Sequence, residues 1–122
     1  MEDEFEEQFE RGLQLFNSEE FYECHDTIED IWLQEVSSEQ AFLQGIIQTA
    51  VAFHHYQHGK LGAARSMMQL AIEKLESYPA GHRGVSVPSL VSELREWKAH
   101  FIQQMGKPSS QLGRLRYPKI VR

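Results

Sequence analysis

Residues 42–58, FLQGIIQTAVAFHHYQH, decide the fold, because this segment is apolar almost all the way round a helix. Such a helix has to be covered on every side, so we expect it at the centre of a helical bundle. Its polar exceptions Gln44, Gln48 and His55 fall on one stripe at helical spacing. Buried amides and imidazoles need hydrogen-bond partners, so this stripe calls for other polar groups facing it. Gly45, beside the stripe, allows another helix to approach closely.

Amphipathic helices are predicted on both sides of this central segment, and no stretch alternates as a strand does. The chain is therefore predicted to be all-α, an antiparallel bundle of about five helices. The second and third helices are introduced by capping-box signals at Asn17 and at Ser37, the third ends at Gly59, and 78–86 form the clear loop. The predicted helices cover about residues 3–16, 17–35, 39–58, 60–77 and 88–105, the second with Asn17 as its cap.

The length of 122 residues predicts one domain. We expect a single helical domain over 1–106 and a basic C-terminal tail over 107–122, whose order the sequence does not predict. Apolar positions repeat at a spacing of 40, so that 16–32 resemble 56–72. This repeat predicts helical hairpins like those of tetratricopeptide proteins.

Charge is distributed unevenly along the chain, whose net charge is −6. Residues 1–40 hold 14 of the 18 acidic residues and carry −13, whereas 41–122 carry +7. This asymmetry predicts that the basic tail, which includes Arg114 and Arg122, docks on the acidic helices. Head-to-tail association into a homo-oligomer is the other outcome. Nucleic acid is not favoured as a partner, because a basic stripe without a reading module is nonspecific.

The sequence carries no sign of export or membrane insertion. It starts MEDEFEEQFE, which is not a signal peptide, and no apolar run reaches the ~18 residues of a membrane span. The one cysteine, Cys24, cannot form an internal disulfide. We expect a soluble, cytoplasmic protein with no membrane partner, and Cys24 as a small core residue.

A second set of polar residues lies on the predicted second helix, in FYECHDTIEDIW (21–32). His25 falls in the middle of the apolar stripe, and Glu29 follows it by four residues, so the carboxylate can orient the imidazole. The two helices together predict a cluster whose members are the candidate site: His25, Glu29, Trp32, Gln44, Gln48 and His55.

Three interpretations of this cluster remain open. It is a buried network that sets helix register, a ligand or active site with a carboxylate-oriented histidine, or a metal site. His54 and His58 also have ligand spacing, but this signal is weak and they lie off the stripe. The chain has no phosphate-binding loop or other cofactor motif, so no cofactor is predicted.

The same motifs carry a resemblance. Phe9 to Tyr78 resembles the small prokaryotic proteins of the domain of unknown function 309 family. The first motif reads His25-Asp26-x-x-Glu29-x-x-Trp32, with Asp26 for the usual Glu, and the second is the hexapeptide 43–48, Leu-Gln-Gly-Ile-Ile-Gln. The resemblance implies a compact all-helical fold and no established activity.

We therefore expect a binding or adaptor module that accepts a peptide or a partner helix. The alternatives are an enzyme of hydrolytic type with His25–Glu29 as general base, or a metal-binding helical bundle.

Overall fold

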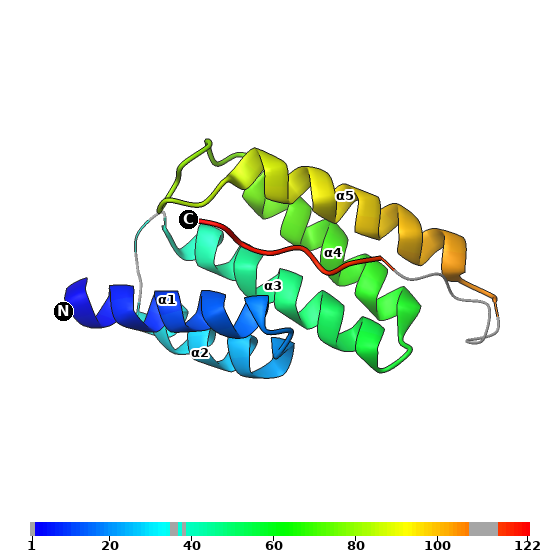
Figure 1. Ribbon diagram of the computed structural model, residues 1–122, viewed down its shortest axis with the longest axis horizontal. Coiled ribbons are helices and arrows are strands. Elements are labelled where there is room, and N and C mark those ends of the chain that lie inside the picture. Colours follow the sequence, from blue (N-terminus) through cyan, green and yellow to red (C-terminus); the bar gives the residue numbers. More distant parts are fainter. Residues whose placement is uncertain (1, 35–36, 38, 108–114) are drawn as a thin grey trace.

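The computed structural model describes residues 2–34, 37, 39–107 and 115–122, and these form five α-helices in chain order (Figure 1). No strand occurs in these ranges, apart from one isolated bridge between His82 and Val85. The helices are α1 (Glu2–Asn17), α2 (Phe21–Gln34), α3 (Glu39–Gln57), α4 (Leu61–Leu75) and α5 (Val87–Gln104). The prediction of an all-α bundle of five helices is confirmed.

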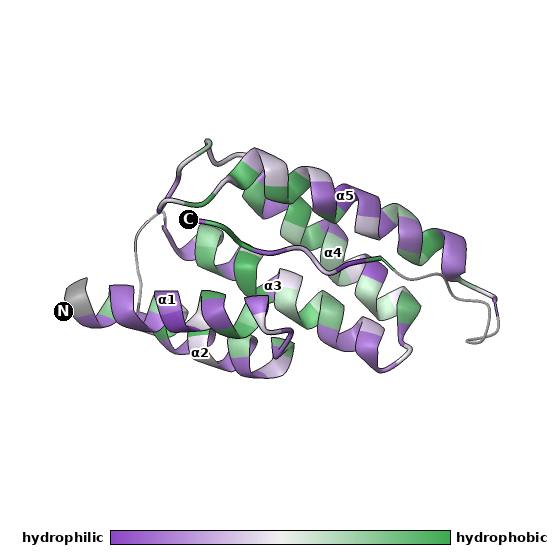
Figure 2. Cartoon of the chain, viewed as in Figure 1, coloured by the Kyte–Doolittle hydropathy of each residue, from purple (hydrophilic) through white to green (hydrophobic). Residues whose placement is uncertain are grey.

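Each helix packs against the next one in the chain, and α3 is in the middle of this order. Figure 1 shows α1 and α2 on one side of α3 and α5 on the other. Hydrophilic and hydrophobic residues alternate around the helices in Figure 2, as expected where one face of each helix is buried. Ten residues of α3 are buried, which agrees with its predicted central place.

The close helix approach predicted at Gly45 occurs between α3 and α4. A Cβ atom at this position would lie 2.7 Å from Cγ of Leu75, which is fully buried. The glycine therefore lets α4 pack directly on the backbone of α3. At the end of α3, Gly59 has a φ of 72° and its N–H donates to the carbonyl of Tyr56, as predicted for a C-terminal cap.

The predicted capping box at Asn17 is wrong. Asn17 is the last residue of α1, α2 begins only at Phe21, and Glu19 takes a left-handed φ of 64° in the turn between them. The Asn17 side chain binds the C-terminal tail instead. Its Nδ2 donates to the carbonyl of Ile120 at 3.0 Å, and its Oδ1 accepts from the Ile120 N–H at 2.7 Å. At α3, the Ser37 hydroxyl accepts from the N–H of Glu39, as its predicted capping role requires.

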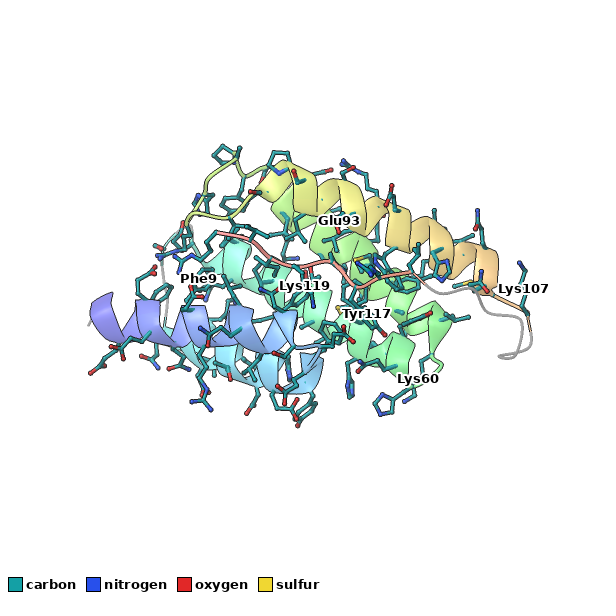
Figure 3. All side chains as sticks on the ribbon, viewed as in Figure 1. Phe9, Lys60, Glu93, Lys107, Tyr117 and Lys119 are labelled. Atoms are coloured by element: carbon teal, nitrogen blue, oxygen red, sulfur yellow. The ribbon has the colours of Figure 1, made fainter. Side chains whose placement is uncertain are left out.

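The described end of the tail, 115–122, lies along the bundle in an extended form and crosses between α1 and α5 (Figures 1 and 3). Tyr117 stacks on Trp97 with ring centroids 5.2 Å apart, and the Trp97 indole N–H donates to the carbonyl of Arg116. Ile120 is 3% exposed and joins the core. Arg114 lies outside the described residues, and the division of the chain at residue 106 stays a prediction, as does the tetratricopeptide-like form of the hairpins.

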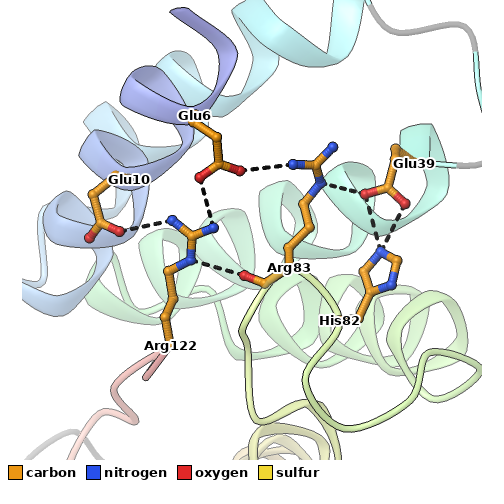
Figure 4. A network of polar contacts seen from close by, with 6 residues as sticks. All are labelled: Glu6, Glu10, Glu39, His82, Arg83 and Arg122. Atoms are coloured by element: carbon orange, nitrogen blue, oxygen red, sulfur yellow. Dashed lines mark hydrogen bonds and ion pairs between the residues drawn. The ribbon is translucent and has the colours of Figure 1, made fainter. Parts of the chain in front are cut away.

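Charge pairs join the tail and the 78–86 loop to the acidic α1 (Figure 4). Arg122 contacts Glu10 at 3.0 Å and Glu6 at 2.9 Å, so the tail does dock on the acidic first helix. Arg83 contacts Glu6 at 2.9 Å and also binds Glu39 at the start of α3. The charge asymmetry of the sequence is thus used for contacts within the chain.

Candidate functional site

The predicted pairing of His25 with Glu29 on α2 is present. The His25 Nε2 lies 3.3 Å from Oε2 of Glu29, one helical turn away. Their side chains are 24% and 42% exposed, respectively, so the pair lies at the surface edge of the bundle rather than deep in the core. A carboxylate in this position orients the imidazole ring.

A pocket of about 240 Å³ adjoins this pair, between α2, α3 and α4. It brings together five of the six predicted site residues, all except His55. The lining combines polar and aliphatic side chains with one indole ring. The lining residues are His25, Glu29, Trp32, Gln44, Ile47, Gln48, Val51 and Met67. Their convergence is a finding, whereas ligand binding by them stays a prediction.

Two polar atoms of this lining are buried without a hydrogen-bond partner in the described part of the chain. They are the indole Nε1 of Trp32 and the Oε1 of Gln48. Gln48 is 9% exposed. By contrast, Thr49 on the same helix is fully buried and its hydroxyl donates to the carbonyl of Gly45 at 2.8 Å. Because buried polar groups are almost always paired, two unpaired ones in a single pocket indicate a place for a ligand or water.

His55 does not line the pocket. His55 is seven residues beyond Gln48, or about 10 Å further along the axis of α3. The ring of Tyr22, which is 55% exposed, contacts the rings of both His25 and His54. Burial lowers the pKa of His54, and the neighbouring His58, His55 and His25 lower it further.

The sequence analysis missed three lining residues. Ile47 and Val51 lie on the same face of α3 as the glutamines, and their aliphatic side chains gave no polar signal. Met67 comes from α4, and only the packing of α4 on α3 brings it to the pocket. The helical spacing of 44–51 could have identified the first two, but nothing local to residue 67 distinguishes it from the core residue Met68.

Cys24 and the candidate metal ligands are the other sources of reactive chemistry that the sequence suggests. Burial raises the pKa of the Cys24 thiol to about 12, so it stays protonated and is a core residue, as predicted. No three His, Cys, Asp or Glu side chains of the described residues are placed to hold a metal ion. His54 and His58 have the predicted ligand spacing, but Nδ1 of His58 donates a hydrogen bond to the carbonyl of His54. This nitrogen is therefore already occupied. The metal alternative therefore has no ligand set in these residues.

In its described residues the protein is all-helical, with a small pocket whose lining is partly polar and partly aliphatic. Residues 9–67 match the family described as Domain of unknown function (DUF309), so the predicted resemblance to this family is confirmed. The match includes both sequence motifs and all eight lining residues.

The chain is also similar to an uncharacterized protein of Aquifex aeolicus (strain VF5). It is 23% identical over 82 residues, which are 66% of this chain and 25% of that protein. The chain thus spans about a quarter of the length of this relative. Within the described residues, no helix is both long and apolar enough to cross a membrane.

Proposed function

We propose that this chain is a cytoplasmic binding module that takes one side chain of a partner peptide into the pocket between α2, α3 and α4. The observation that carries the proposal is the pair of unpaired buried atoms, Trp32 Nε1 and Gln48 Oε1, in a lining that is otherwise partly aliphatic. Ligand sites combine apolar walls with a few placed polar groups in this way. The single buried thiol fits the reducing conditions of the cytoplasm.

The size of the pocket supports a side chain rather than a whole metabolite as its occupant. Sites for small-molecule ligands enclose about 300–1,000 Å³, whereas this pocket encloses about 240 Å³. One anchor side chain in a desolvated pocket is also how many protein interfaces obtain most of their affinity. The exposed ring of Tyr22, which contacts His25, extends the surface beyond the pocket and offers contact area to the rest of the peptide.

Selection from a phage library of random dodecapeptides tests this proposal. Val51 lines the pocket and is partly exposed, so Val51→Phe fills the space with a ring. Leu70→Phe, at an exposed position of α4 outside the lining, is the matched control. We expect the selected peptides to bind Val51→Phe at least about tenfold more weakly and the control unchanged. Peptides that bind both variants like the parent chain, or a library that yields no binder sensitive to Val51→Phe, would overturn the proposal.

An enzyme is the second candidate, and the 3.3 Å contact between His25 and Glu29 favours it. This pair is suited to activating a water molecule as a general base. The lining has no hydroxyl or thiol side chain to serve as a nucleophile, and the Cys24 thiol is held protonated. A hydrolase here would have to attack with water directly. Loss of hydrolysis of a p-nitrophenyl acetate probe in His25→Ala, with retention in His100→Ala, would favour this candidate over the binding module.

A further inference from the structure

The two unpaired atoms of the lining have opposite hydrogen-bonding character. The Trp32 indole nitrogen can only donate a hydrogen bond, and the Gln48 carbonyl oxygen can only accept one. A ligand group that satisfies both has to carry an acceptor and a donor at the same time. We infer that the pocket takes a carboxamide on a short aliphatic stem, of the kind found in the Gln and Asn side chains of a partner peptide. This inference rests on the proposed function and specifies its ligand.

Charged groups of the same size satisfy only half of the lining. A carboxylate accepts from Trp32 but brings a second acceptor to Gln48, and the Glu29 carboxylate in the same lining repels it. An ammonium group donates to Gln48 and is attracted by Glu29, but it leaves the indole N–H unpaired. Leaving a buried polar atom unpaired costs more than its hydrogen bond contributes, so the neutral group is selected.

The aliphatic wall fits the stem of such a group. Ile47, Val51 and Met67 line the pocket together with the polar residues and remove methylene and methyl groups of the ligand from water. The two polar atoms are themselves buried, so a ligand reaches them only after a small shift of the lining. Met67 is partly buried and has an unbranched side chain with three rotatable bonds, so this part of the lining can adjust its shape to a ligand.

Three probes that share one branched aliphatic stem and are similar in size separate the ligand classes: isovaleramide, isovalerate and isopentylamine. The chain has two tryptophans, so its ¹H–¹⁵N spectrum contains two indole signals. The Trp97 N–H is already bonded to the carbonyl of Arg116 and serves as an internal control, while Trp32→Phe assigns the other signal. We expect isovaleramide to shift the Trp32 indole signal and to bind at least about tenfold more tightly than either charged probe. Gln48→Met should abolish this preference, and Gln103→Met, an exposed glutamine on α5, should retain it.

The outcomes distinguish this inference from the proposed function. Tighter binding of isovalerate or isopentylamine, or equal binding of all three with a shifted Trp32 signal, would overturn the carboxamide inference and leave the pocket as a binding site. Fragments of this size bind weakly, so each probe is added to about 100 mM. If none of them shifts the Trp32 signal, both the inference and the proposed function fail. An unchanged Trp97 signal in each variant verifies that the bundle is folded.

Discussion

The substitution Gln48→Met is expected to raise the free energy of unfolding, which is the opposite of the usual effect of changing a buried residue. Gln48 is 9% exposed and its Oε1 has no partner among the described residues. An unpaired buried polar atom costs about 1–3 kcal/mol, and methionine is similar in length, flexible and without that atom. We expect a gain of about 1–2 kcal/mol, which for a domain of this size corresponds to a rise in Tm of roughly 3–10 °C.

Urea denaturation followed by far-ultraviolet circular dichroism measures this change directly. Gln103→Met, on the exposed face of α5, makes the same chemical change in water and should alter stability by less than about 0.5 kcal/mol. A loss of stability of about 1 kcal/mol or more in Gln48→Met would mean that Oε1 forms a hydrogen bond in the folded protein. The cluster would then be a satisfied structural network, and the argument for a ligand pocket would be refuted.

Three further predictions concern the packing, the charge network and the tail. Gly45→Ala should destabilise the protein by about 1–3 kcal/mol, because the added methyl group overpacks against α4. At Gly62 no atom lies within 4 Å of an added Cβ, so Gly62→Ala should stabilise the protein by about 0.5–1 kcal/mol. Equal denaturation midpoints for the two variants would contradict the close approach of α3 and α4 at Gly45. Arg83→Met removes the ion pairs with Glu6 and Glu39, so it should lower the free energy of unfolding by about 1–2 kcal/mol and make that free energy less dependent on salt. Arg65 is exposed, and Arg65→Met should change neither the stability nor its salt dependence. Urea denaturation in about 0.05 and 1 M NaCl measures both quantities. Burial raises the pKa of Tyr117 to about 12. Between about pH 10 and 12 the tyrosine therefore ionises in the unfolded chain but not in the folded one, and the free energy of unfolding falls as the pH rises. Tyr117→Phe should lose less stability over this interval, and an equal loss for both proteins in thermal melts would refute the raised pKa.

The polar cluster was largely predictable because its members obey helical periodicity. His25 and Glu29 are one turn apart on α2, and Gln44 and Gln48 are one turn apart on the otherwise apolar α3. A buried helix with a polar stripe has to face other polar groups, which restricts the neighbouring helix to the one with a misplaced histidine. His55 shows the limit of this reasoning. Periodicity specifies the face of a helix on which a residue lies, but not its position along the helix axis relative to the pocket.

The sequence by itself determined the five helices, the central place of α3, the close approach at Gly45 and five residues of the pocket, since each of these depends on spacing within one or two adjacent helices. Only the tertiary structure decided that Asn17 holds the backbone of Ile120 rather than capping α2, that Met67 closes the pocket, and that Arg83 and Arg122 share the acidic partners on α1. Asn17 and Ile120 are 103 residues apart. Contacts of this kind depend on the crossing and axial register of whole helices, and local periodicity contains no information about either.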